Sequence, residues 1–240
     1  MAVVREKQKF KSALFASTFE DLRSLFQKSS AVFIDMPMGL PEAPSVQMPW
    51  RACDCEARKI LSSKRNTVFL IPGRSSVEAS DYKTACLRHK KRTGKGFPKQ
   101  AWGLFERVLE VDRFLRCGKG FQRKIFESHP EVCLWSLNGG RVVEPSKKCG
   151  AGQSERVSIL SQFAKDAASF YSRQKKCAKR EYIRGGDVLD AMVLALSAEV
   201  SFLGSRFGQV PEKPPRDRYG IPMRIVFPKE LIKKSGEKKS

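Results

Sequence analysis

The 240-residue sequence has no hydrophobic run long enough to cross a membrane, and its start lacks the apolar segment of a signal peptide. It has only two histidines, His89 and His129, and its seven cysteines include no CxxC pair. These absences give little support to a zinc site, and an odd number of thiols fits a reducing compartment. We therefore expect an intracellular protein, cytoplasmic with the nucleus as the alternative, that makes no membrane contact and whose thiols are buried or incidental.

Acidic residues are also scarce, since 25 Asp and Glu stand against 46 Lys and Arg, for a formal net charge of +21. No acid occurs between Asp81 and Glu106, and this interval holds a basic cluster: Lys83, Arg88, Lys90, Lys91, Arg92, Lys95 and Lys99. Two further clusters lie at 173–184 and after Lys213. The clustering favours a polyanionic partner, most simply nucleic acid, over a merely soluble basic surface. The residues expected to bind it are Lys90, Lys91, Arg92, Lys95 and Lys99.

A glycine- and lysine-rich loop follows this basic segment at 93–100. Its chemistry resembles that of a phosphate cradle, but it lacks the P-loop pattern and follows a helix instead of a strand. A flexible surface turn is the alternative interpretation.

Residues 31–35 form a short β-branched and aromatic run that ends in Asp35, before Pro37 and Gly39. An apolar run without alternation predicts a strand that is buried on both faces. Asp35 would then stand at the carboxyl edge of a sheet, where open α/β folds bind ligands. The alternative is that Asp35 only begins a turn.

Residues 185–203 predict a helix that is closed by Gly204 and is apolar almost all round, hence buried. Asp187 and Asp190 lie three residues apart near its start and share one face. A role at the helix N-terminus explains Asp187, because negative charge is stabilised there. It explains Asp190, one turn further in, less well.

The remaining patterns alternate between strands and helices, which predicts an α/β fold. Strands are expected at 2–5, 10–16, 67–71, 123–127 and 223–227, and helices at 17–26, 50–61, 80–92, 101–114, 130–137 and 154–171. Residues 42–122 are expected to form a helical insertion, and 229–240 a charged, disordered tail. On the helix at 50–61, the polar face with Arg51, Asp54 and Arg58 is interpreted as a solvated ion ladder.

These features converge on one chemistry. A carboxylate ends a strand, a carboxylate pair opens a buried helix, and the surface is basic. Mg²⁺ and Mn²⁺ prefer carboxylate oxygens, and two such ions can clamp the attacking and leaving oxygens of a phosphodiester.

The chain also resembles the domain-of-unknown-function 429 family of predicted nucleases with an RNase H-like fold. The matching stretches occur in the order of the family and are 34–41, 51–58, 93–96, 99–102, 110–112, 126–131, 146–148 and 187–191. The resemblance implies a single domain over 1–228 with a mixed sheet flanked by helices. It implies Asp35, Asp187 and Asp190 as catalytic ligands of Mg²⁺ or Mn²⁺, with His129, Glu131 and Lys147 in support of the site.

The sequence departs from the family in two places. The family opens with a glycine-rich strand that carries the first metal-binding Asp, and that strand is not seen here. The family pattern DDxxDA here begins with Gly186, so it is one Asp short. We therefore expect an incomplete site, weak metal binding and an open edge on the Asp35 strand. The alternatives are a non-catalytic nucleic-acid-binding protein, and a metabolic or structural protein whose acids only cap helices and begin turns.

Overall fold

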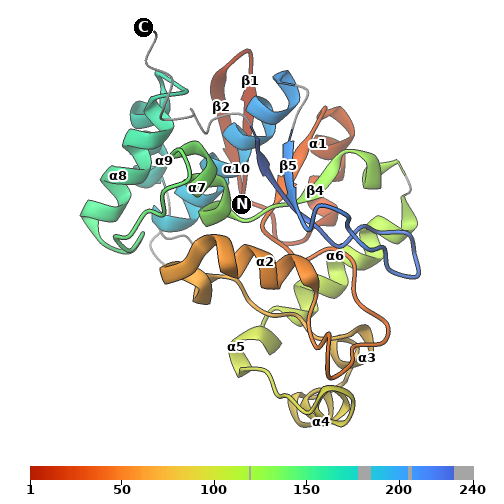
Figure 1. Ribbon diagram of the computed structural model, residues 1–240. Coiled ribbons are helices and arrows are strands. Elements are labelled where there is room, and N and C mark those ends of the chain that lie inside the picture. Colours follow the sequence, from red (N-terminus) through yellow and green to blue (C-terminus); the bar gives the residue numbers. More distant parts are fainter. Residues whose placement is uncertain (119, 178–184, 205–206, 230–240) are drawn as a thin grey trace, which may run out of the picture. The chain divides into compact units, whose positions relative to one another are not determined.

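The computed structural model describes residues 1–118, 120–177, 185–204 and 207–229. It is an α/β structure, as predicted, in which the chain divides into two compact units (Figure 1). Unit 1 comprises Met1–Ala16, Pro130–Gly208 and Phe227–Ser240, and unit 2 comprises Ser17–His129 and Gln209–Val226. No helix of the described residues is long and apolar enough to span a membrane. The single domain over 1–228 stays a prediction, and the expected tail lies, apart from Lys229, outside the described residues.

Unit 1 is built around one long helix. Its elements are β1 (Ala2–Glu6), β2 (Lys9–Leu14), α7 (Pro130–Leu137), α8 (Gly150–Ser161), α9 (Ala167–Cys177) and α10 (Gly185–Leu203). Helix α10 packs against α7, α8, α9 and β1. This is possible because its apolar side chains surround the helix, and Val188, Leu189, Met192 and Val193 are all fully buried. The prediction of a buried helix at 185–203 is confirmed.

The β1–β2 hairpin is antiparallel, with Lys7 and Gln8 at its tip. Both residues have positive φ, 49° and 61°, as a two-residue turn that matches the twist of the strands requires. Glu199 of α10 fixes the hairpin, because its carboxylate accepts hydrogen bonds from Arg5 Nε (2.7 Å) and Gln8 N (2.9 Å). The two strands expected at the start of the chain are therefore present.

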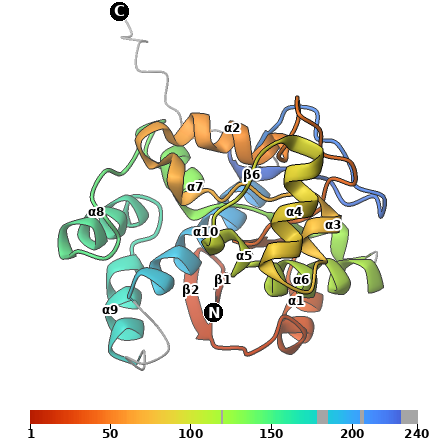
Figure 2. The ribbon, with the colours of Figure 1, turned by 90° about the horizontal axis from the view of Figure 1, so that it is seen from below.

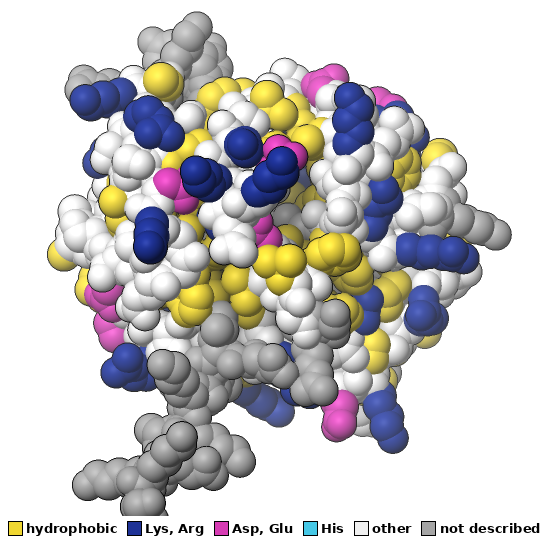
Figure 3. All heavy atoms as spheres, turned by 90° about the horizontal axis from the view of Figure 1, so that it is seen from above, with side chains coloured by type: hydrophobic (Ala, Val, Ile, Leu, Met, Phe, Trp, Pro, Cys, Tyr) yellow, Lys and Arg dark blue, Asp and Glu magenta, His cyan; other side chains and the backbone are white. Residues whose placement is uncertain are grey.

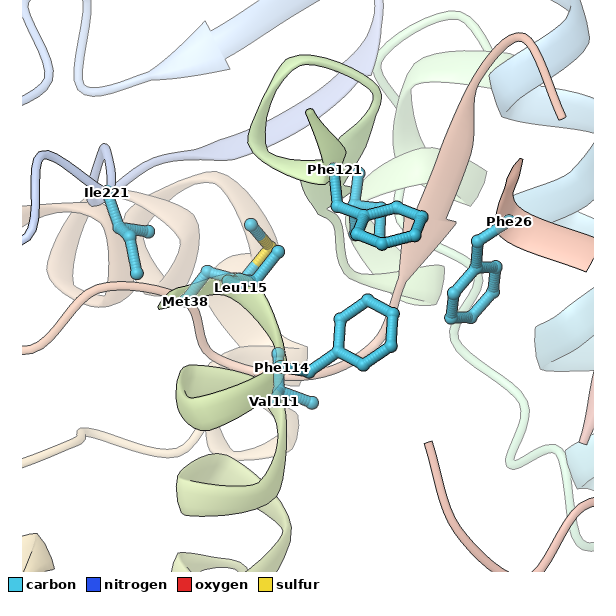
Figure 4. Packing of buried hydrophobic residues seen from close by; sticks show 8 residues of the cluster. Phe26, Met38, Val111, Phe114, Leu115, Phe121 and Ile221 are labelled. Carbon is cyan, nitrogen blue, oxygen red and sulfur yellow. The ribbon is translucent and has the colours of Figure 1, made fainter. Parts of the chain in front are cut away.

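Unit 2 is mostly helical. Its helices are η1 (Glu20–Leu22), α1 (Arg23–Lys28), α2 (Ala52–Leu61), η2 (Ser62–Thr67), α3 (Arg74–Val77), α4 (Tyr82–Thr93), α5 (Lys99–Trp102), α6 (Phe105–Cys117) and η3 (Phe121–Arg123). Figure 2 shows α4 beside α3, which also contacts α6. One core cluster joins Phe26 of α1 to Phe114 and Leu115 of α6 and to Phe121 (Figure 4). Helices α2 to α6 thus lie within 42–122, and that this range is an insertion stays a prediction.

A parallel pair of strands crosses unit 2. Strand β3 (Val32–Ile34) pairs with β4 (Ile125–Glu127), and Ser128 N donates to Ile34 O at 2.8 Å. Among the described strands β3 forms a ladder with β4 alone. The expected burial on both faces is not found, because Phe33 is buried but Val32 and Ile34 are only half-buried.

The third strand pair is β5 (Phe207–Val210) with β6 (Ile225–Pro228), and the boundary between the units passes through both strands. The sequence predicts β6 but not β5, which lies in a segment expected to be a loop. The pieces of sheet in the described residues are two-stranded, so the larger mixed sheet stays a prediction.

The strand expected at 67–71 is absent from the described structure, and side chains explain why. Thr67 ends η2 and Val68 is extended, and the backbone groups of Val68 and Ile71 pair with side chains of α2 and not with a neighbouring strand. Arg58 Nη1 donates to Val68 O at 2.8 Å, and Ile71 N donates to Asp54 Oδ2 at 2.9 Å. The β-branched residues indicated an extended chain correctly, but its partner is not visible in sequence.

Two expected helices are each divided. The helix at 101–114 becomes α5 and α6, with Gly103 between them, a residue that disfavours helix interiors. The helix at 154–171 becomes α8 and α9. The sequence does not indicate the break between Ser161 and Ala167, because the apolar pattern continues through it and Leu160, Ala164 and Ala167 are all buried.

Candidate functional site

Asp35 directly follows β3, and Ser128 and His129 directly follow β4. The carboxyl ends of two parallel strands meet at one edge, so the predicted position of Asp35 at such an edge is confirmed. Asp35 is exposed, and the chain turns away after it through Gly39, whose φ is +72°. A Cβ at Gly39 would lie 2.8 Å from Met223 Cγ, so the turn requires glycine.

A pocket of about 130 Å³ opens at this edge, inside unit 2. The segment 35–37 and the extended segment 67–69 line it, together with Ser128 and His129. A cavity needs about 10–15 Å³ of such volume to hold one water molecule, so this pocket has room for several water molecules or a small group.

His129 presents a free ring nitrogen at this pocket. Its Nε2 lies 3.2 Å from Thr67 O, and its Nδ1 is buried with no hydrogen-bond partner among the described residues. A carbonyl can only accept, so Nε2 carries the proton in the neutral ring and Nδ1 is left as an acceptor. Nδ1 of His129 is therefore a buried acceptor without a partner among the described residues.

Behind the pocket lies a buried cluster of Arg51, Asp54 and Glu127. Arg51 binds Asp54 through Nη2–Oδ1 (2.5 Å) and Nε–Oδ2 (3.2 Å). It binds Glu127 through Nη1–Oε2 (2.8 Å) and Nη2–Oε1 (2.6 Å). The interpretation of Arg51 and Asp54 as a solvated ladder is wrong, because both are about 2% exposed or less.

The burial and the net charge of this cluster account for the shifted pKa values of Glu127 and Arg51. One guanidinium and two carboxylates carry a net charge of −1 out of contact with water. Burial raises the pKa of Glu127 to about 7, against the attraction of Arg51 and the Met38 amide. Burial opposes the charged form of Arg51, but Asp54 and Glu127 outweigh it and raise its pKa well above the ordinary value.

Cys53 adds a thiol to Asp54 and Glu127, so that their possible ligand atoms lie within 4.8 Å of one another. Metal binding does not fit this group, because the guanidinium of Arg51 already occupies the carboxylates. Met38 N and Ile71 N take further positions on them, at 2.7 and 2.9 Å. Burial also raises the pKa of the Cys53 thiol, which keeps its proton. The cluster is structural: it joins α2 to the end of β4.

The other two predicted ligands lie in unit 1, at the start of α10. Asp187 is exposed, and Asp190 forms an ion pair with Lys147. Gly186 gives Lys147 room, since a Cβ there would lie 3.3 Å from both Cγ and Cδ of the lysine. The structure therefore brings Asp187, Asp190 and Lys147 together in unit 1, whereas Asp35 and His129 belong to unit 2.

Glu131 has a different environment from that expected of a site residue. It is 8% exposed and accepts a hydrogen bond from Arg156 Nη2 at 2.6 Å, within unit 1. Arg156 also donates to Pro145 O (2.8 Å) and Gly152 O (3.0 Å). Glu131 thus holds α7 to α8 and to the segment before it.

The expected nucleic-acid-binding residues are all exposed: Lys90, Lys91, Arg92, Lys95 and Lys99. They lie on α4, on the following loop and at the start of α5. The face in Figure 3 shows dark-blue basic side chains spread over the surface, with acids sparse among them. The loop at 93–100 begins as a helix cap, since Gly94 has φ +72° and donates to Lys90 O. In the second basic cluster, 178–184 lies outside the described residues.

Comparison with known proteins identifies the family to which the chain belongs. The family described as "Protein of unknown function (DUF429)" matches residues 1–216. The chain belongs to the DUF429 family. No similar protein is found among the curated proteins or the solved structures.

In this DUF429 chain the motif stretches separate into two groups. Arg51, Asp54 and Glu127 are buried in the cluster behind the pocket. Asp112 belongs to a second buried network, in which Arg74 binds it at 2.9 and 3.0 Å and also binds Asp217 at 2.8 Å. Sequence reasoning missed these networks. Their members lie in different kinds of element, since Asp54 and Asp112 are in helices and Glu127 is in β4, so no single sequence pattern indicated them. Asp35, Asp187 and the basic residues of α4 form the second group, which is exposed.

Proposed function

We propose that this DUF429 protein is a metal-dependent phosphodiester hydrolase of nucleic acid with an RNase H-like fold. Asp35, Asp187 and Asp190 would hold Mg²⁺ or Mn²⁺. The observation that carries the proposal is the position of Asp35, which is exposed at the carboxyl end of two parallel strands and lines a pocket with His129.

The donor set supports the proposal. Three carboxylates suit a hard divalent cation. When bound, such a cation supplies an activated water and neutralises charge on the phosphodiester. The pocket beside Asp35 gives room for a small group next to that carboxylate.

The chain's own side chains would do the remaining work. Asp35 would orient the cation from the strand edge, and Asp187 and Asp190 would do so from α10. His129 lines the pocket beside Asp35, so its ring would contact the substrate there. The basic residues of α4 would hold the anionic strand, and they are exposed as this role requires.

A second candidate is a nucleic-acid-binding protein without catalysis. The ion pair between Lys147 and Asp190 favours it, because an ammonium group takes the position in which a metal ligand would have to be available. Gly186 leaves space for the Lys147 side chain in this pair, and Gly186 occupies the position at which the family pattern has an Asp. In this alternative the basic surface binds and no bond is cleaved.

A cleavage assay with Mn²⁺ separates the two candidates. Labelled single-stranded and duplex DNA and RNA are incubated with the full chain, with Asp35→Asn, and with Glu106→Gln, a control for an exposed acid on α6. The hydrolase proposal expects cleavage that Mn²⁺ activates, that Asp35→Asn abolishes and that Glu106→Gln retains. Binding without cleavage by the unaltered chain would support the second candidate instead.

A further inference from the structure

A second hollow in unit 2, of about 520 Å³, lies where α2 ends and η2 begins. Five side chains line it, three of them cationic and none acidic: Arg58, Lys59, Ser62, Arg65 and Asn66. Converging cations with polar groups between them form the chemistry of an anion site.

Arg58 is held in place by the chain itself. Its Nη1 donates to Val68 O at 2.8 Å and its Nη2 donates to Asn66 Oδ1 at 3.0 Å. These bonds use two of the five N–H donors of a guanidinium and fix its plane. An anion that binds the remaining donors therefore meets a side chain that is already ordered, which lowers the entropic cost of binding.

Lys59 and Arg65 are exposed, and neither forms an ion pair with an acid in the described part of the chain. The favourable interaction of cations with a helix C-terminus explains Arg58 and Lys59, which lie in the last turn of α2. It does not explain Arg65 and Asn66, which belong to η2.

A strained backbone turn at Ser62 brings Arg58 and Lys59 of α2 close to Arg65 and Asn66 of η2. Ser62 has φ +43° and ψ −100°, a conformation that residues other than glycine rarely adopt. Its N–H still bonds back to Arg58 O and Lys59 O, so the chain reverses immediately and η2 packs against α2. The reversal places Asn66 within hydrogen-bond distance of Arg58.

The positive field extends beyond the hollow. Lys59, Arg58 and Lys95 each act to lower the pKa of the Cys55 thiol on α2, although burial and Asp54 raise it overall. Lys95 follows α4, so the hollow and the basic residues of the loop act on the same point of α2. Cations from the hollow and from the loop at 93–100 that lie near the same helix suit a polyanion better than a single small anion.

The hollow also adjoins the Asp35 pocket through one short segment. Residues 65 and 66 line the hollow, and 67 and 68 line the pocket. Arg58 donates to the carbonyl of Val68, and His129 contacts the carbonyl of Thr67. An anionic chain that occupies the hollow would therefore lie close to the strand edge at which Asp35 is located.

We propose that Arg58, Lys59 and Arg65 bind the backbone phosphates of a nucleic-acid strand next to the scissile position. This inference rests on the proposed function and adds the path of the substrate to it. Arg58 would give a fixed fork for one phosphate, and Lys59 and Arg65 would neutralise its neighbours.

Salt-dependent binding tests the site. A fluorescein-labelled oligothymidylate is titrated by anisotropy with the full chain and with Lys59→Gln/Arg65→Gln, whose altered side chains are exposed. The matched control is Lys9→Gln/Lys11→Gln, which removes the same charge from exposed positions of β2. Two lost phosphate contacts should reduce the slope of log K against log salt by about 1.4 in the first variant and leave it unchanged in the control. An equal change in both variants, or none in either, would overturn the site.

Cleavage in Mn²⁺ separates this inference from the proposed function. Lys59→Gln/Arg65→Gln should raise KM several-fold with kcat unchanged, whereas Asp35→Asn should lose kcat and keep the salt slope of binding. An unaltered chain that binds with the expected slope but cleaves nothing refutes the hydrolase and supports the phosphate site. A chain that does not bind the oligonucleotide refutes both.

Discussion

Arg51 and Glu127 are 76 residues apart in the chain and meet through two parallel hydrogen bonds of 2.8 and 2.6 Å. The same guanidinium binds Asp54, so one arginine joins the start of α2 to the end of β4, where Ser128 and His129 begin to line the pocket. The edge that presents Asp35 is therefore stabilised by buried charge pairs at the pocket.

The first prediction concerns this pair. Arg51→Met should lower the free energy of unfolding by about 3–5 kcal/mol, because it leaves two buried carboxylates without their cation. The matched control is Arg107→Met, whose ion pair with Glu110 is exposed, and it should cost less than about 1 kcal/mol. Urea unfolding of the three proteins measures both values, and equal losses in the two variants would contradict the structural role of Arg51.

The second prediction concerns pH and His89. This side chain is fully buried with its ring centroid 4.4 Å from that of Trp50, and burial lowers its pKa to about 4 from an ordinary 6.5. The unfolded chain therefore binds more protons between these values, so the contribution of His89 to stability is present above pH 6.5 and is lost as pH falls toward 4. The loss can reach about 3 kcal/mol.

The test of His89 is a difference between two profiles, because the raised pKa of Glu127 acts in the opposite direction over part of the same range. Melting temperatures from pH 7 to pH 4 are compared for the unaltered chain and for His89→Leu. The unaltered chain should lose more stability on acidification than the variant, and parallel profiles would refute the assignment.

The third prediction concerns Lys147. If Asp190 is a metal ligand, Lys147→Met should raise the affinity for Mn²⁺ about fivefold or more, because it removes a competing charge worth about 1 kcal/mol even in high dielectric. Lys148→Met is the control, since it removes an exposed neighbour of the same charge. Calorimetric titration with Mn²⁺ measures the effect, and equal affinities in the two variants would show that Lys147 does not block the site.

The fourth prediction concerns α4. Charge reversal at Lys90, Lys91 and Arg92 should weaken binding to every oligonucleotide sequence alike, by roughly tenfold or more at moderate salt, because the contacts are to phosphates. A panel of unrelated sequences of equal length checks this by anisotropy. Affinity that is independent of salt, or a loss confined to one sequence, would argue against this role of α4.

Much of the fold could be predicted because the local signals agree with it. Pro130 begins α7, and Gly204 follows the end of α10, so both helices have the predicted bounds. The run that ends at Asp35 is a strand, as its β-branched residues indicate. The basic residues of α4 could be placed on the surface because no acid accompanies them.

The buried charge networks could not be predicted, since their partners are far apart in sequence. Arg51 finds Glu127 across 76 residues and Arg74 finds Asp217 across 143. The same long-range pairing turns the expected strand at 67–71 into an extended segment, because Arg58 and Asp54 satisfy its backbone. The resemblance placed Lys147 in support of the site with Asp190 as a ligand, but it did not indicate that the two side chains form an ion pair.

The most direct test of the central claim asks whether Asp35 and Asp190 hold one metal ion together. Mn²⁺ affinity is measured for the full chain, Asp35→Asn, Asp190→Asn and the double variant, with Glu106→Gln as control. A shared site predicts that each single change weakens binding strongly and that the double change adds little beyond either one, because the site is already lost. Effects that simply add, or Mn²⁺ binding that neither change alters, would contradict the proposed metal site.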